Sequence, residues 1–341
     1  MGITATDSTL GSAVPTIDLR TARGDAKALS ALDAACREHG FFLLVGHGID
    51  AEVARMWQAS AAFFHGTQAN KHSIRRSEDQ PLGYYDRELT KQQRDLKEVF
   101  DFTAPRTEGK DPNQWPAEPA NFKDSMAAFY HAAGELAEQT LALVYQALAF
   151  GLEAESGGAN AVAGEAATLA ALPSGSVRTS NVRLNCYPLQ DPLSASEQRA
   201  TTALGDMALH HHTDPGLLTL LLQDATGGLQ TQLRDRTWIA VPPDVDSVVV
   251  NLGDALQVLS NDRYRAAVHR VLPMQEKERY STPFFLNPQP DAELAPIAEL
   301  SAAPPRYRAF TWREYIKHRI DDNYADLGAD DTQITHYRIA S

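Results

Sequence analysis

A succession of short apolar or alternating segments follows Ser180, and this feature limits the possible folds more than any other in the sequence. Turn residues such as Pro242-Pro243 and Asn261-Asp262 separate the segments. Short strands at this spacing are typical of a β-sandwich or a jelly roll. The strands that we predict span residues 182–187, 217–222, 228–233, 238–241, 247–252, 255–259, 268–272 and 280–286.

The N-terminal half has a different pattern, in which apolar residues recur at helical spacing. Asp50 is a suitable N-cap for a helix that continues to Phe64. The polar segment 66–116 is expected to be irregular, and a loop with a short helix is expected between Gly157 and Leu172. Helices are predicted over residues 26–39, 50–64, 121–152 and 311–320, and strands over residues 14–19 and 41–45.

These patterns divide the chain into four regions. A flexible tail is predicted for residues 1–12, and a mainly helical region packed on the barrel for residues 13–175. Residues 176–290 are predicted to form the β core, and residues 291–341 a C-terminal helical extension. The predicted fold class is therefore a mostly β core with flanking α-helices.

Composition excludes several classes of function. The 341 residues carry a formal net charge of −13, whereas a nucleic-acid partner requires a basic face. No run of about 18 apolar residues is present, so no membrane span is predicted. Cys36 and Cys186 form no Cys-x-x-Cys motif and are compatible with a reducing cytoplasm. We expect a cytoplasmic protein without nucleic-acid or membrane partners; the oligomeric state stays open, and a monomer is compatible with the sequence.

A candidate metal motif lies in the run His210-His211-His212-Thr213-Asp214, at a predicted strand edge. Because residues i and i+2 of an extended segment point the same way, His212 and Asp214 can bind one metal together. His269, near the start of a later predicted strand, is the candidate third ligand. Two histidines and one carboxylate leave three octahedral positions open, which suits Fe(II). Taken alone, the His-x-Asp pair also fits a solvated surface strand.

A candidate anion site follows in Arg279-Tyr280-Ser281, on the next predicted strand. Arg279 and Ser281 are expected to face the same side. A guanidinium binds a carboxylate through two parallel hydrogen bonds, and a hydroxyl adds a third. An ordinary surface ion pair would explain Arg279 if this triplet stood alone.

Together these segments resemble the isopenicillin-N-synthase-like branch of the 2-oxoglutarate/Fe(II) oxygenases, which includes many plant hormone and flavonoid oxygenases. The resemblance covers most of residues 14–338. Its motifs are Arg183-Leu184-Asn185-Cys186-Tyr187-Pro188, His212-Thr213-Asp214-Pro215-Gly216-Leu217-Leu218-Thr219, Asn251-Leu252-Gly253-Asp254, Ser260-Asn261-Asp262-Arg263-Tyr264, His269-Arg270-Val271 and Arg279-Tyr280-Ser281.

The resemblance implies a double-stranded β-helix, a jelly roll of the cupin kind, with flanking helices. It implies an enzyme of secondary metabolism that oxidises a small molecule, by hydroxylation or desaturation, with Fe(II), O₂ and 2-oxoglutarate, and with ascorbate as support in vitro. Iron ligands would be His212, Asp214 and His269, with no further catalytic residue. The 2-oxoglutarate site would comprise Arg279, Ser281, Tyr187 and Asn185. The segment Asn251 to Asp254 is mainly structural in this family.

Substrate-binding residues are less constrained. By position in the family fold, the candidates are Tyr84, Tyr85, Leu89 and Phe285, each of which structural packing would also explain. His210 has the same strand parity as His212 and joins these candidates, although solvation or core packing explains His210 and His211 equally well. Cations that could meet an anionic substrate are Lys91, Lys317 and Arg319.

Three alternatives stay open at this point. Some members of the family use O₂ without 2-oxoglutarate and keep the Arg-x-Ser pair for their own substrate's carboxylate. A barrel that binds a small ligand without chemistry is a second alternative. A zinc hydrolase is a third, although such enzymes typically carry a His-x-x-x-His helix that this sequence lacks.

Overall fold

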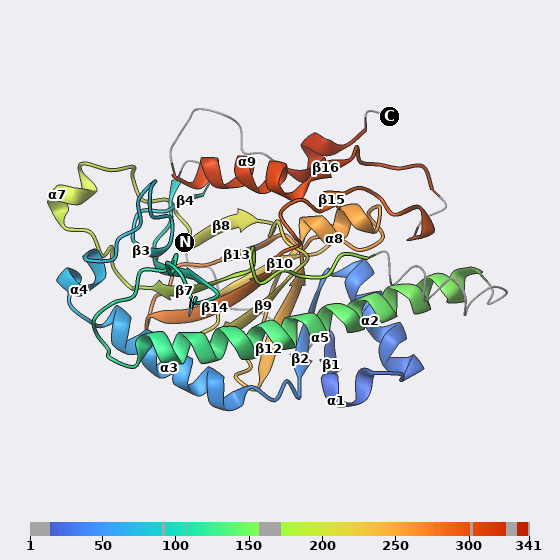
Figure 1. Cartoon of the computed structure of the whole chain (residues 1–341), viewed down its shortest axis with the longest axis horizontal. Coiled ribbons are helices and arrows are strands. Elements are labelled where there is room, and N and C mark those ends of the chain that lie inside the picture. Colours follow the sequence, from blue (N-terminus) through green and yellow to red (C-terminus); the bar gives the residue numbers. More distant parts are fainter. Residues whose placement is uncertain are drawn as a thin grey trace, which may run out of the picture.

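An eight-stranded sheet forms the larger part of the β core, in the order β1-β2-β12-β9-β14-β7-β6-β3 (Figure 1). The computed structural model describes residues 14–90, 93–106, 108–156, 172–300, 303–324 and 333–339, so the predicted tail lies outside it. β1 runs parallel to β2, and all other neighbours are antiparallel. The strands are β1 (Thr16–Asp18), β2 (Phe41–Val45), β12 (Ser247–Leu252), β9 (Leu218–Gln223), β14 (Arg279–Leu286), β7 (Asn181–Tyr187), β6 (Glu98–Thr103) and β3 (Gly83–Tyr85).

A four-stranded sheet, in the order β11-β10-β13-β8, forms the second half of the core. Its strands are β11 (Trp238–Ala240), β10 (Leu229–Gln232), β13 (His269–Val271) and β8 (Leu209–His212). Two further antiparallel pairs join β4 (Leu89–Thr90) to β5 (Gln93–Arg94), and β15 (Glu293–Leu294) to β16 (Phe310–Thr311). Residues of both large sheets line one cavity. This arrangement confirms the predicted double-stranded β-helix.

Side chains along β7 and β14 point alternately into the hydrophobic core and into the cavity. Even-numbered residues, such as Leu184 and Phe284, are buried in the hydrophobic core. Odd-numbered residues of both strands line the cavity instead. Because strand side chains alternate between faces, each strand serves both surfaces.

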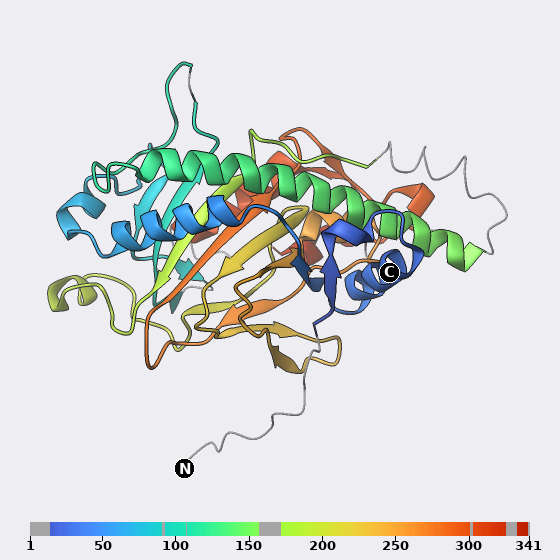
Figure 2. The ribbon, with the colours of Figure 1, turned by 90° about the horizontal axis from the view of Figure 1, so that it is seen from below.

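Three helices cover the outer face of the large sheet. α5 (Phe122–Ser156) runs along it beside α2 (Ala26–Glu38) and α3 (Asp50–Phe64) (Figures 1 and 2). Tyr130 of α5 packs its ring 5.3 Å from that of Phe284 on β14. On the opposite side of the core, α9 (Trp312–Tyr324) lies near β8 (Figure 1). The remaining short helices are α1 (Leu19–Ala22), α4 (Gln68–His72), α7 (Ala195–Gln198), α8 (Asp254–Leu259) and two 3-10 turns, η1 (Ala298–Leu300) and η2 (Ile334–Tyr337).

Two local predictions are wrong. The apolar run 255–259 forms α8 rather than a strand, because a short apolar run has no period that separates the two structures. Asp50 does not cap α3: Ile49 occupies the N-cap position, and Asp50 lies in the first turn. A carboxylate there still stabilises the helix through the macrodipole.

The segment 66–116 is more regular than predicted. It contains α4, β3 and β6, and the last two belong to the large sheet. β6 is almost wholly buried even though it carries Glu98 and Asp101. Each carboxylate pairs with a buried cation, so the charged residues of this segment lie inside the fold rather than on an irregular surface loop.

The division into four regions stays a prediction. β2, β3 and β6 belong to the predicted N-terminal region but share a sheet with strands of the predicted β core. The expected loop and helix near residues 157–171 lie outside the described residues.

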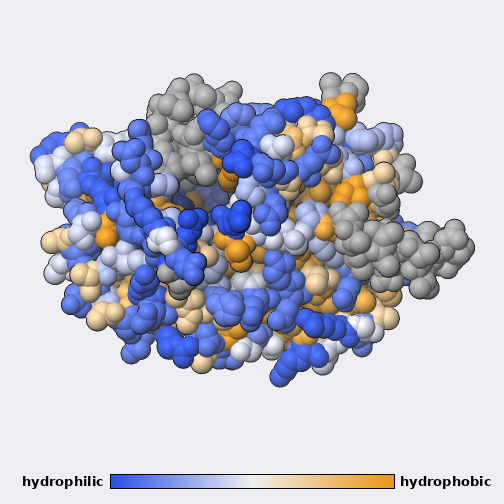
Figure 3. Space-filling view, in the orientation of Figure 1, coloured by the Kyte–Doolittle hydropathy of each residue, from blue (hydrophilic) through white to orange (hydrophobic). Residues whose placement is uncertain are grey.

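Within the described ranges, no helix is both long and apolar enough to traverse a membrane. On the face drawn in Figure 3, hydrophobic residues form small separate areas among hydrophilic ones.

Candidate functional site

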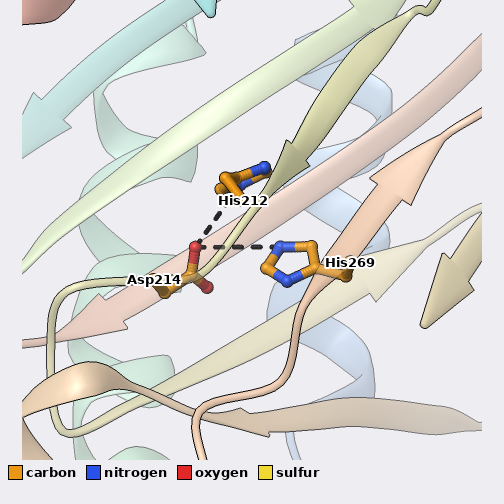
Figure 4. A group of neighbouring side chains, drawn as sticks. All are labelled: His212, Asp214 and His269. Carbon is orange, nitrogen blue, oxygen red and sulfur yellow. Dashed lines mark ion pairs between the residues drawn. The ribbon is translucent and has the colours of Figure 1, made fainter. Parts of the chain in front are cut away.

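Three predicted metal ligands converge at one end of the small sheet. His212 ends β8, Asp214 lies two residues later, and His269 begins β13 opposite His212. Asp214 Oδ1 lies 3.6 Å from His212 Nε2 and 3.7 Å from His269 Nε2 (Figure 4). The ligand atoms of the three residues all lie within 4.8 Å of one another. One ion between them would contact all three.

Backbone carbonyls fix the tautomer of both imidazoles. His212 Nδ1 donates to the carbonyl of His210 over 2.8 Å, and His269 Nδ1 donates to the carbonyl of Ala267 over 3.0 Å. Because a carbonyl only accepts, Nδ1 of each ring carries a proton. In the neutral form of either ring, the Nε2 lone pair faces the Asp214 carboxylate.

The other oxygen of Asp214 is held by two donors that the sequence analysis missed. Thr219 Oγ1 donates to Oδ2 over 2.6 Å, and Asn251 Nδ2 donates to it over 2.8 Å. Each is a buried polar residue in a mostly apolar strand, and a buried polar group of this kind requires a partner. That signal was present in the sequence, but only the fold identifies Asp214 as the partner.

Electrostatics favour the metal-binding protonation state of His212 and Asp214. Burial, helped by the neighbouring His269, lowers the pKa of His212 to about 3. Burial alone would raise the pKa of Asp214, yet His269, His212 and the two hydrogen-bond donors lower it. Neutral imidazoles and an ionised carboxylate are the forms that bind a divalent metal. The donor set thus fits the iron that the resemblance implies.

Arg279 lies fully buried in the cavity wall, at the start of β14. Its Nη2 donates to Gln223 Oε1 over 3.2 Å, and its guanidinium lies 5.0 Å from the ring of Tyr187. Nε and Nη1 have no hydrogen-bond partner among the described residues. Buried unpaired donors are costly, so these two nitrogens favour an anionic ligand such as a carboxylate beside the guanidinium.

Two neighbours of Arg279 complete the predicted anion site. Ser281 and Asn185 are buried opposite each other on β14 and β7, with Asn185 Nδ2 3.4 Å from Ser281 Oγ. Tyr187, Asn185, Arg279 and Ser281 all line the same cavity as the three metal-ligand candidates. Its volume of about 500 Å³ is in the range of small-molecule sites.

The substrate candidates from the sequence are dispersed. Phe285 lines the cavity, whereas Tyr84, Tyr85, Leu89 and His210 are not among the described residues that do. The Tyr84 hydroxyl donates to Glu98, and Tyr85 packs on a guanidinium. The buried His210 ring lies against Asp95 and Gln93, while His211 on the other side of β8 is exposed.

The cationic substrate-binding candidates that the structure describes are also dispersed. Arg319 lines the cavity and donates to the carbonyl of Thr213 over 2.8 Å, whereas Lys317 is exposed. Lys91 lies outside the described residues.

A network of buried charges, here named the ionic wall, flanks the cavity and was not found from the sequence. Lys97 Nζ lies 2.8 Å from Glu88 Oε2 and 3.2 Å from Asp95 Oδ2. The Arg183 guanidinium donates to both oxygens of Asp101 over 2.7 and 2.9 Å. The ionic wall comprises Arg76, Glu88, Asp95, Lys97, Asp101 and Arg183, of which Glu88, Lys97, Asp101 and Arg183 line the cavity.

Comparison with known proteins identifies the family. The sequence model of the 2OG-Fe(II) oxygenase superfamily matches residues 179–288, and that of the non-haem dioxygenase in morphine synthesis N-terminal region matches residues 14–118. Gibberellin 2-beta-dioxygenase 2 of Oryza sativa subsp. japonica is 31% identical over 339 residues, which cover 93% of this chain and 87% of that protein. The chain belongs to the 2-oxoglutarate/Fe(II) oxygenase superfamily.

Further relatives of the oxygenase support this assignment. Flavanone 3-dioxygenase 2 of the same rice is 31% identical over 89% of this chain and 82% of its own. A full-length Neurospora crassa protein, crystallised with alpha-KG and 5-formyluracil, has a TM-score of 0.71 at 26% identity and covers 94% of this chain and 99% of its own. JOX2 in complex with 2OG, Fe and JA has a TM-score of 0.73 at 26% identity, over 96% and 89% of the two chains.

The matched family model, the relatives and the solved structures together give the reaction type. The protein is a non-haem Fe(II)- and 2-oxoglutarate-dependent dioxygenase that oxidises a small organic molecule while 2-oxoglutarate is decarboxylated to succinate and CO₂. Its cofactor and co-substrates are Fe(II), 2-oxoglutarate and O₂.

Proposed function

We propose that His212, Asp214 and His269 hold the iron of this oxygenase. The convergence of their three ligand atoms within 4.8 Å carries the proposal. Thr219 and Asn251 orient the carboxylate, and the two backbone carbonyls orient the rings. Three protein ligands on one face leave room for co-substrate and O₂.

Arg279 is the proposed anchor for one carboxylate of 2-oxoglutarate. Its two unpaired guanidinium nitrogens, in a fully buried position, support this role. Ser281 adds a hydroxyl beside them, and Tyr187 and Asn185 complete the wall around the co-substrate. Iron and 2-oxoglutarate, when bound, supply the oxidising chemistry, while the side chains bind, orient and exclude water.

The substrate is, in this proposal, a small molecule with an apolar body and a neutral polar group. Phe285, Pro283 and Ile316 offer an apolar surface on the cavity, which supports the apolar body. The ionic wall offers hydrogen bonds, but its three cations and three carboxylates already pair with one another. An added ligand charge would have to compete with those pairs, so a hydroxyl, carbonyl or amide suits the wall better.

An assay of succinate formation over a panel of small molecules tests this function. The panel contains matched pairs that differ only in a carboxylic acid or its primary amide. We expect substrate-dependent succinate, with the amide preferred in each pair, and none with His212→Ala. Preference for the acids would contradict the neutral polar group, and an iron-replete, active His212→Ala would contradict the ligand assignment.

Substrate-dependent succinate also separates this function from the two alternatives of the same fold. An oxidase without 2-oxoglutarate would consume O₂ without forming succinate, and a binding barrel would do neither. Hydroxylation and desaturation are distinguished by the mass of the product.

Location and partners remain proposals. Cys36 and Cys186 are both buried free thiols, which supports a reducing compartment such as the cytoplasm. We propose a role in secondary metabolism, a small-molecule substrate as partner, and no nucleic-acid or membrane partner. Size-exclusion chromatography with light scattering would decide whether the protein is a monomer.

A further inference from the structure

A buried contact behind His212 has no role in the site as described so far. The ring of His210 lies with Nδ1 2.7 Å from Asp95 Oδ1 and with Nε2 2.9 Å from Gln93 Oε1. The backbone N–H of His210 donates to the same Asp95 oxygen over 3.3 Å. One carboxylate thus holds both the ring and the main chain of His210.

β8 needs such support because its strand pairing is irregular. Among the described strands, it is an edge strand that pairs with β13 alone. Leu209 lies opposite Val271, and His212 lies opposite His269, so three steps along β8 face two along β13. This is the register of a β-bulge, which interrupts the ladder and turns the side chains beside it. The extra residue lies between Leu209 and His212.

His210 connects the bulge to the metal-ligand candidate. Its carbonyl accepts the hydrogen bond from His212 Nδ1 at 2.8 Å. The direction of that carbonyl therefore determines where His212 Nε2 points, which is toward Asp214 Oδ1 at 3.6 Å. Such outer contacts orient ligating imidazoles.

The surroundings leave His210 and Asp95 little freedom. Asp95 is completely buried, accepts from Thr90 Oγ1 over 2.7 Å, and lies 3.2 Å from Lys97 Nζ. A Cβ added at Gly205 would approach His210 Cε1 to 2.5 Å, so the ring fills space that only glycine leaves open. The ring is therefore packed as well as hydrogen-bonded.

We propose that Asp95 and His210 are positioning residues for His212. They hold the bulge of β8 in the form that directs His212 Nε2 toward the metal. This inference rests on the proposed assignment of His212 as an iron ligand.

Titration of the metal-free protein with Co(II) under argon tests the proposal, with absorption spectra and calorimetry as readouts. In His210→Leu we expect Co(II) affinity about 10- to 100-fold below wild type, the usual effect of losing an outer contact to a metal ligand. We also expect altered ligand-field bands, which a loss of stability alone would not produce. His211→Leu is the matched control, because it makes the same change on the exposed side of β8, and it should keep the wild-type affinity and spectrum.

Two further variants separate the outcomes. Asp95→Asn should weaken Co(II) binding in the same direction; if His210→Leu fails to fold, Gly205→Ala crowds the ring without removing a polar group and carries the same expectation. Wild-type affinity and spectra in these folded variants, with Co(II) binding lost in His212→Ala, would overturn the positioning role alone. Wild-type Co(II) binding by His212→Ala would overturn the ligand assignment, and the positioning role with it.

Discussion

The side-chain amide of Asn251 donates a 2.8 Å hydrogen bond to Asp214 Oδ2, so β12 helps to set the direction of a carboxylate that follows β8. With Oδ2 occupied by Asn251 and Thr219, Oδ1 is the oxygen that faces both imidazoles. The large sheet thus takes part in forming a centre whose histidines both come from the small sheet.

Asn251→Leu should weaken metal binding, since it removes a donor to Asp214 while keeping a similar volume. We expect Fe(II) affinity to fall about 10- to 100-fold, measured by anaerobic calorimetry. Asn113→Leu removes a buried amide that bonds to Thr103 instead and should leave Fe(II) affinity unchanged. Equal affinities in both variants would show that Asn251 is structural only.

Arg279→Leu should impair 2-oxoglutarate binding and spare the metal. Loss of a buried partner for a carboxylate costs about 2 to 5 kcal/mol of binding free energy. The dissociation constant for 2-oxoglutarate, measured with the metal-loaded protein under argon, should rise accordingly, while Co(II) affinity stays the same. The exposed Arg178 at the cavity is the control, and Arg178→Leu should change neither value. An Arg279→Leu protein that binds 2-oxoglutarate normally would refute the anchor.

Lys97→Met should destabilise the fold, because it leaves Glu88 and Asp95 short of a buried partner. Breaking one side of a buried ion pair costs about 3 to 5 kcal/mol, to be read from urea unfolding. Lys123→Met removes an ion pair to Asp111 from a half-exposed lysine and should cost less than about 1 kcal/mol. Similar losses in the two variants would mean that burial of the ionic wall has no energetic consequence.

The ionic wall also predicts a pH dependence of stability. Burial alone would raise the pKa of Glu88, yet Arg183, Lys97 and Arg76 hold that pKa well below its ordinary value of 4.5. A carboxylate whose pKa is lower in the folded state than in the unfolded state stabilises the fold at pH values above the unfolded-state pKa. This contribution is lost as the pH falls from the unfolded-state pKa through the folded-state pKa.

Comparison with Glu88→Gln isolates that contribution. Urea unfolding between pH 5.5 and 3.5 should show a smaller loss of unfolding free energy in Glu88→Gln than in wild type. Parallel pH profiles would contradict the assignment of this effect to Glu88.

The sequence predicted the His212–Asp214 pair because the two residues are close together in the chain. His212 and Asp214 lie two residues apart, which indicated that they could bind one metal, and His269 was the candidate third ligand near the start of a later predicted strand. The same parity argument placed Arg279 beside Ser281. By contrast, apolar pattern alone could not distinguish strand from helix at 255–259, where α8 forms.

The ionic wall could not be predicted in this way. Arg183 and Asp101 meet only because β7 pairs with β6, and Arg76 reaches Glu88 from a loop. The many charged residues between positions 86 and 98 indicate a solvent-exposed segment, unless the residues that pair with them in the fold are known. The Asp95–His210 contact likewise depends on the approach of the β4–β5 hairpin to β8.

A crystal structure of the protein grown under argon with Fe(II) and 2-oxoglutarate tests the account most directly. Anomalous scattering at the iron edge should give one peak within bonding distance of His212 Nε2, Asp214 Oδ1 and His269 Nε2, with a carboxylate of 2-oxoglutarate on Arg279. A peak elsewhere, or 2-oxoglutarate bound away from Arg279, would contradict it.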